Sequence, residues 1–301
     1  PTSDWRPYYF YLGISLPLTA VLAVLLAVPF MLPYVPPPMA ILKGFVEQVT
    51  RAMQLPRGYE SGVGLCLAFL IGLVPAVVAT EHYMREYRGV EFGLTRFLRD
   101  LVEVRKTGLS PEKCIINLAK RDYGRFTRHL RLVAKKIGWG RPMREAYEEF
   151  ARRVRSWLAR IAMFLLVESI EVGGGTPETL ESLANFAEMV ELVEREKRRS
   201  LRPLIVVPYI GCIVTTLVVI VLIVFMNSIM GVAKISLPVV SLTRTFLPPV
   251  VINSYLMGLT AGKISTERVY GGFLHAAMLL LATLGAMAAS PYLSGFVRLG
   301  W

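Results

Sequence analysis

The chain has 301 residues, of which 54% are hydrophobic and only 19% are charged, and its formal net charge is +12. Soluble domains average about 25% charged residues, and here the apolar residues are gathered in long runs. The composition therefore excludes a secreted or nucleic-acid-binding globule and indicates a protein that crosses the membrane several times.

Long stretches without Asp, Glu, Lys or Arg mark the expected membrane spans. They cover residues 10–32, 62–80, 204–233, 245–262 and 269–297. Because a helix needs about 20 apolar residues to cross the hydrocarbon core, they predict about five transmembrane helices. The fourth is the shortest and contains Pro248-Pro249. If it does not cross, the C-terminus moves from the outside to the cytoplasm.

The distribution of charge orients these spans. Residues 81–203 contain 25 of the 34 Lys and Arg residues and 18 Asp and Glu residues. Segments rich in Lys and Arg stay in the cytoplasm. We therefore expect an N-terminal membrane region at 1–80 with two spans, a cytoplasmic helical bundle at 81–203, and a C-terminal membrane region at 204–301 with about three spans, all in the plasma membrane.

An amphipathic helix is predicted on the outer side, within the first membrane region. Ile41, Leu42, Phe45 and Val46 recur at helical spacing, with polar side chains on the opposite face. Such a helix either lies on the outer membrane surface or packs against the neighbouring spans.

The cytoplasmic segment reads as all-α, with about six helices and no strand alternation. Two of its turns share the frame Gly-x-Ser/Thr-Pro-Glu, at Gly108–Glu112 and Gly174–Glu178. Such a frame ends one helix with a left-handed glycine and starts the next with a hydroxyl cap followed by proline. We expect Gly108 and at least one of Gly173, Gly174 and Gly175 to make these turns.

A few polar side chains interrupt the spans. His275, Asn253 and Asn227 are functional candidates because ionisable and polar groups in the membrane are costly. The alternative is that they are neutral groups bonded between helices, and for His275 we favour this interpretation, with a bond to a carbonyl or to a neighbour such as Asn253. His82 and His129 are expected at the surface. The three cysteines, Cys66, Cys114 and Cys212, show no metal or redox spacing and are expected to be buried as small hydrophobic residues.

Two basic clusters stand out in the cytoplasmic segment. Arg152, Arg153 and Arg155 precede its most apolar helix, where they form either a docking surface for an acidic partner or a solvated helix face. The bases between Lys197 and Arg202 adjoin the third span and are expected to contact anionic lipids.

No pattern for catalysis is present. The sequence lacks a Gly-x-x-x-x-Gly-Lys-Ser/Thr phosphate loop, a cluster of His and Cys ligands, and a nucleophile–base pair. We therefore expect no enzymatic activity, no catalytic residue, no cofactor and no metal.

Several segments carry a family resemblance. FLRDLVEVRKTGLSPEKCIINLA (97–119) resembles the first hairpin of the type II secretion F-domain family, and GWGRPMREAYEEFA (138–151) is similar to its mid-domain segment. VESIEVGGGTPETLESLANFAE (167–188) resembles its most diagnostic stretch, although the acidic residue is displaced to Glu171. GLTAGKISTERVYGGFLHAA (258–277) is similar to archaeal members. With one such domain, the chain is similar to the short archaeal and tight-adherence-type members.

The resemblance implies a function. Proteins of this family are membrane platforms of machines for type IV pili, archaella, tight-adherence pili and type II secretion. They couple a cytoplasmic secretion ATPase to pilin-like subunits that move from the membrane into a filament. The resemblance also implies a homo-oligomer, at least a dimer, in contact with membrane lipids.

Two other functions remain open. A permease subunit of an ATPase-driven transporter would need a polar pathway, for which the spans offer only His275, Asn253 and Asn227. A membrane-anchored nucleic-acid binder would need exposed aromatic residues among its bases. Because the aromatic residues mostly fall on apolar stripes, we expect no nucleic-acid partner.

Overall fold

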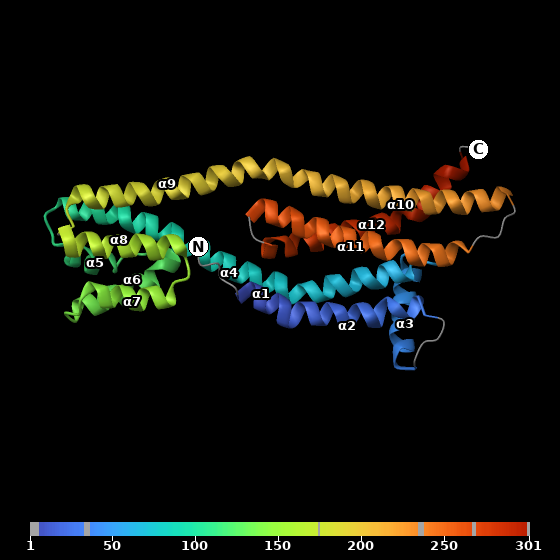
Figure 1. Ribbon diagram of the computed structural model, residues 1–301, viewed down its shortest axis with the longest axis horizontal. Coiled ribbons are helices and arrows are strands. Elements are labelled where there is room, and N and C mark those ends of the chain that lie inside the picture. Colours follow the sequence, from blue (N-terminus) through green and yellow to red (C-terminus); the bar gives the residue numbers. More distant parts are fainter. Residues whose placement is uncertain (1–5, 33–36, 174, 234–237, 267–268, 300–301) are drawn as a thin grey trace. The chain divides into compact units, whose positions relative to one another are not determined.

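The computed structural model describes residues 6–32, 37–173, 175–233, 238–266 and 269–299, and all of the elements in these ranges are helical (Figure 1). This confirms the all-α class. The helices are α1 (Arg6–Phe10), α2 (Leu16–Leu26), α3 (Pro37–Ala52), α4 (Glu60–Lys106), α5 (Pro111–Leu118), α6 (Thr127–Gly138), α7 (Met143–Arg153), α8 (Trp157–Gly173), α9 (Pro177–Leu201), α10 (Val206–Ala233), α11 (Val239–Thr266) and α12 (Gly272–Leu299). A π-helical segment, Tyr11–Ser15, joins α1 to α2, and short 3₁₀ segments lie at Val28–Phe30, Gly124–Phe126, Arg202–Ile205 and Val269–Gly271.

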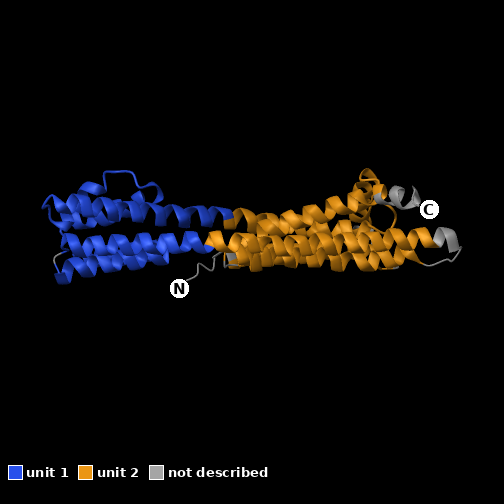
Figure 2. Ribbon diagram, turned by 90° about the horizontal axis from the view of Figure 1, so that it is seen from above, with its two compact units in different colours: residues 1–5, 81–197 blue, residues 6–80, 198–301 orange. Residues whose placement is uncertain are grey.

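The chain divides into two compact units (Figure 2). Among the described residues, unit 1 comprises Glu81–Lys197, and unit 2 comprises Arg6–Thr80 and the chain from Arg198 onward. The chain passes between the units inside helices. Helix α4 is unbroken from Glu60 to Lys106, and α9 continues through one 3₁₀ turn into α10.

Unit 1 is a helical bundle with its own core. Its buried side chains come from α4, α5, α6, α7, α8 and α9 and include Phe97, Phe126, Phe150, Leu130 and Leu166. Phe126 and Phe150 pack edge to face, with ring centroids 6.1 Å apart. This burial is the main source of stability for the bundle, because the hydrophobic contribution scales with the apolar area removed from water.

Four helical runs in the described chain are long and apolar enough to cross a membrane. They are Tyr8–Phe30, Glu60–Lys106, Pro177–Ile229 and Val269–Tyr292. Four of the five predicted spans lie in these runs, which establishes a polytopic membrane protein.

The remaining predicted span, 245–262, is the fourth in chain order and lies in α11, which is not among the four runs. Helix α11 is nevertheless continuous through Pro248 and Pro249 and packs against α10 and α12 within unit 2 (Figure 1). Tyr209 bonds to His275 and Cys212 lies against Thr283, so α10 and α12 run in the same direction. Two helices that cross in the same direction need a return crossing between them, and α11 is the segment that joins them.

Glycines set the closest helix contacts in unit 2. A Cβ on Gly262 of α11 would lie 1.9 Å from the Cα of Gly272 in α12, and one on Gly258 would lie 2.1 Å from the Cα of Ala276. Small residues four apart let membrane helices approach in this way. A similarly close contact occurs on α4, where a Cβ added to Gly72 would meet Thr19 of α2.

Helix α3 is the predicted amphipathic helix. Val46 is fully buried and packs with Leu26 and Phe30, whereas Ile41 and Phe45 are 80% and 51% exposed. The helix therefore packs against α2 along one stripe, and two apolar side chains remain on its outer face.

Candidate functional site

The two turns with the Gly-x-Ser/Thr-Pro-Glu frame lie together in unit 1. Gly108 and Gly175 both have positive φ, of 86° and 59°. A Cβ on Gly175 would lie 3.0 Å from Cγ of Pro111 in the other turn. Gly173 has open space around it, and Gly174 lies outside the described residues. Among the described members of the triplet, Gly175 is the one held in the left-handed conformation.

Ser110 and Thr176 both stand at the N-cap position as predicted, but only one of the two hydroxyls makes a capping hydrogen bond. The Thr176 Oγ1 accepts a hydrogen bond from the Thr179 N–H at 3.3 Å, as a helix cap should. Ser110 occupies the same position before α5, but its side chain makes no capping bond. The start of α5 is favoured instead by Pro111 at the first helical position. Its ring fixes φ near the helical value, and because proline has no N–H, no capping partner is needed there.

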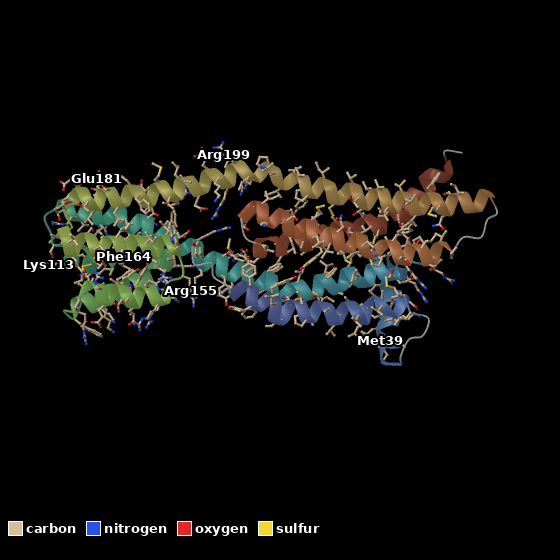
Figure 3. The ribbon with its side chains drawn as sticks, in the orientation of Figure 1. Met39, Lys113, Arg155, Phe164, Glu181 and Arg199 are labelled. Carbon is tan, nitrogen blue, oxygen red and sulfur yellow. The ribbon has the colours of Figure 1, made fainter. Side chains whose placement is uncertain are left out.

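The basic cluster lies where α7 gives way to α8. Arg152 and Arg155 are exposed and have no ion pair in the described chain, whereas Arg153 is held by Glu149 at 2.6 Å. Only two of the three predicted docking arginines are therefore available to a partner. Figure 3 places Arg155 in the connection between the two helices.

Buried neighbours fix the position of Arg155. Val154 is 3% exposed and Ser156 is 2% exposed. The Ser156 hydroxyl donates to Glu91 Oε1 at 2.8 Å and accepts the N–H of Ala159 at 3.2 Å. Because the backbone of this segment is already ordered, binding through Arg155 costs little backbone entropy.

The displaced acid Glu171 also has a partner. Arg144 of α7 bonds to Glu171 Oε2 at 3.2 Å and to Glu168 one turn earlier in α8. These carboxylates hold the Arg144 pKa above its usual value. The pairs cross-link α7 to α8 at the surface, where such contacts contribute only modestly to stability.

The structure buries one histidine that was expected at the surface. His129 is 6% exposed and its ring meets Phe150 edge to face, so this prediction is wrong. His82 is exposed as predicted. The apolar stripe of Leu130, Val133 and Ala134 on the same helix was the sequence signal that could have predicted the burial of His129. His129 adjoins that stripe, and its imidazole is small enough to enter the core beside it.

The polar side chains of the predicted spans are separated. His275 Nδ1 lies 2.9 Å from the Tyr209 hydroxyl, so its partner is Tyr209 rather than Asn253. Asn253 keeps a buried Nδ2 without a partner in the described chain, and Asn227 is exposed on α10. Among the described residues, no hydrogen bond joins these three side chains to one another.

Sequence reasoning missed a buried hydroxyl–thiol cluster between three helices. Cys212 of α10 donates to Ser254 Oγ of α11 at 3.2 Å, and Ser254 lies 2.7 Å from Thr283 Oγ1 of α12. All three cysteines are buried and free, as predicted. No periodicity could have found the cluster, because Ser and Thr usually bond to their own helix and give no signal of a partner elsewhere.

A groove between α4 and α9 is a further feature that the sequence did not show. It encloses about 340 Å³. Its lining residues are Phe92, Thr95, Arg96, Arg99, Glu188, Glu191, Leu192 and Arg195. All of them belong to unit 1.

The fold and these sites define a class: an all-α polytopic membrane protein with a charged helical bundle built on helices that continue into apolar runs. Residues 97–224 match the family model of the type II secretion system (T2SS), protein F. This confirms the resemblance, and these residues are a domain of that family. The match extends from α4 through α9 into α10, so the domain includes part of an apolar run. No curated protein and no solved structure matches the chain.

Proposed function

We propose that this protein is the plasma-membrane platform of a filament-assembly or secretion machine of the type IV pilus kind. In this role it couples a cytoplasmic secretion ATPase to the movement of pilin-like subunits into the filament. The observation that carries the proposal is the family domain at 97–224, whose last helices form one run from the bundle into an apolar segment.

The helical run Pro177–Ile229 gives a path for coupling. Helix α9 contributes Leu180, Leu183 and Ala187 to the core of unit 1, so a displacement of the bundle moves this helix. The 3₁₀ turn Arg202–Ile205 then interrupts the run before α10. A short 3₁₀ stretch inside a long helix is a common position for a hinge, and here it would let α10 change its tilt.

Arg152 and Arg155 are proposed to dock the ATPase. Both are exposed and form no ion pair with the described residues, and the exposed Trp157 follows them at the start of α8. Arg and Trp are the residue types that most often dominate binding energy at interfaces. Lipid contact is proposed for the basic end of α9, near Arg199 (Figure 3), because each base near an anionic surface contributes about 1 kcal/mol.

A homo-oligomer, at least a dimer, is part of the proposal. Helices α8 and α9 leave apolar side chains exposed on unit 1, including Phe164, Leu165, Met189 and Val193. Exposed apolar residues gathered on neighbouring helices mark interaction surfaces.

The permease alternative has no observation in its favour. Of the polar groups that it would need, His275 is bonded to Tyr209, Asn227 is exposed on α10, and Asn253 has no hydrogen bond to either in the described chain; the buried hydroxyl bond of the spans joins Ser254 to Thr283. In the described spans these bonds join neighbouring helices, which is the structural use of polar residues in membranes.

The test is binding of the full chain, reconstituted in nanodiscs, to the secretion ATPase of the same organism. Double charge reversal, Arg152→Glu with Arg155→Glu, should slow association and weaken its salt dependence, because exposed charges act mainly on the encounter rate. The matched control reverses Lys113 and Lys120, which are exposed elsewhere on the bundle. Arg153 is left intact because Arg153→Glu would place a like charge against Glu149, its present ion-pair partner.

Three results separate the possibilities. Equal association rates for the double variant and its control would remove these arginines as the docking site. A lack of ATPase binding by the unmodified protein would contradict the platform function. Tight binding of competitor DNA together with no ATPase binding would favour the nucleic-acid alternative.

A further inference from the structure

The groove between α4 and α9 is built from two matching helix faces. Phe92 is followed on α4 by Thr95 and Arg96, three and four residues later, and Arg99 lies four and three residues beyond those two. Glu188, Glu191, Leu192 and Arg195 show the same spacing on α9. Residues at these spacings share one face of a helix. Two such faces side by side form a channel into which a third helix fits.

Apolar side chains are open at this channel. Phe92 is 51% exposed and Leu192 is 60% exposed, although both line the groove. The volume of about 340 Å³ is near the lower limit for small-molecule sites, which enclose about 300–1,000 Å³. One or two apolar side chains of a partner would fill it, which is what an amphipathic helix supplies at its anchor positions.

The charges of the groove select the partner. Three arginines and two glutamates line it, which leaves one excess positive charge. Arg99 donates from Nε to Glu188 Oε1 at 2.8 Å, and Arg195 pairs with Glu191. Arg96 forms no ion pair in the described chain, and its guanidinium lies 5.8 Å from the centroid of the Phe92 ring. One guanidinium beside an apolar surface is therefore available for a carboxylate.

We propose that this groove binds an acidic amphipathic helix of a partner protein. An apolar side chain of that helix inserts between Phe92 and Leu192, and a carboxylate one turn away pairs with Arg96. The inference goes beyond the proposed function, since neither Arg152 nor Arg155 lines the groove.

The first experiment places the photo-crosslinking residue p-benzoylphenylalanine at Phe92 in the full chain, within its native membrane. The adduct is identified by mass spectrometry. We expect a partner peptide that has helical apolar spacing and a carboxylate within four residues of the crosslinked side chain. The same probe at Trp139, which is 69% exposed on another part of unit 1, controls for random collisions.

Charge reversal tests the pairing. Arg96→Glu should lower the yield of the adduct about tenfold, as expected for loss of one charge-assisted pair and its replacement by repulsion. Reversal of the partner's carboxylate to arginine should restore the yield in the Arg96→Glu background. Arg96→Gln, a milder change, should give an intermediate loss. Lys113→Glu alters the net charge of the bundle equally and should leave the yield unchanged.

Several results would overturn the proposal. They are an adduct with lipid, an adduct with a second copy of this chain, an adduct with a peptide lacking a nearby carboxylate, and a yield no higher than that from Trp139. Equal yields for Arg96→Glu and Lys113→Glu, in variants that unfold at the same temperature as the unmodified protein, would also overturn it. Because the ATPase docking assay uses other residues, either proposal can fail while the other stands.

Discussion

Arg105 donates a hydrogen bond from Nε to the carbonyl oxygen of Gly175 at 2.9 Å, although the two residues are 70 positions apart. A second bond, from its terminal nitrogen to the Leu109 carbonyl at 3.0 Å, holds its own turn. One guanidinium thus ties together the two turns that share a sequence frame. The α4–α5 and α8–α9 connections are thereby joined within unit 1.

Removing this tie should destabilise the bundle. Arg105→Ala deletes both bonds and should lower the free energy of unfolding by about 1.5–3 kcal/mol, the range for a hydrogen bond that involves a charged group. Arg105→Lys keeps the charge but has only a compact ammonium group, so we expect an intermediate effect. Thermal unfolding of the full chain in detergent measures both. Equal stability of all three proteins would show that water replaces the bonds without loss.

The glycine triplet offers a matched pair of substitutions. Gly175→Val should cost about 1–2 kcal/mol or more, because φ is +59° and the new Cβ would lie 2.9 Å from Ile170 Cγ1. Gly173→Ala, at the end of α8 with nothing within 4 Å, should be neutral or slightly stabilising. The measurements are unfolding temperature and filament number in cells. Normal filaments from Gly175→Val at normal protein level would show that the turn tolerates strain.

The close crossing of α11 and α12 should be sensitive to a single methyl group. Gly262→Ala would place its Cβ 1.9 Å from the Cα of Gly272, so the helices must separate. We expect a loss of about 1–3 kcal/mol, typical of overpacking. Gly211→Ala in α10 is the control, because nothing lies within 4 Å of its Cβ. The measurement is the resistance of each variant to unfolding in detergent. Equal resistance of Gly262→Ala and Gly211→Ala would show that the close crossing does not contribute to stability.

Acid should destabilise unit 1 through His129. Burial, followed by the nearby Arg128 and Arg153, lowers its pKa, while Glu86 opposes this. The unfolded chain, with a histidine pKa of about 6.5, therefore binds the proton more readily than the folded one. Stability should fall as the pH drops below about 6.5 and level off below the folded pKa.

His129→Phe isolates this effect, because it keeps a ring against Phe150 and removes the titrating group. The unfolding temperature of the unmodified chain should drop between about pH 7.5 and 5.5, and that of the variant should drop less. If both lose the same number of degrees, the pH dependence arises from other groups.

Single cysteines test the membrane topology in a background without the three native cysteines. The charge distribution places Ser110 and Thr176 inside and Pro37 outside. The parallel course of α10 and α12 adds a position near the end of α12, Tyr292, which should be labelled from outside. Labelling of Tyr292→Cys only after the cells are opened would mean that α11 does not cross. External labelling at position 110 would invert the whole scheme.

Much of the fold could be predicted because its determinants are local. Apolar runs of about 20 residues, the charge between Glu81 and Pro203, and the glycine and proline frames each lie within one short segment. They gave the all-α class, most of the spans and the turns at Gly108 and Gly173–Gly175. The burial of the cysteines was likewise predictable, since their neighbours in sequence are apolar.

Other features were decided only when distant segments met. Whether His129 is buried depends on Phe150, 21 positions later, and which glycine takes the left-handed conformation depends on the packing of Pro111. The groove of Phe92 and Leu192 is tertiary in the same way, whereas the pairing of Arg153 with Glu149 is a local contact four residues apart on α7. Sequence fixes what each helix can bury. Which neighbour it meets is set by the packing of all the helices together, and no single segment encodes that.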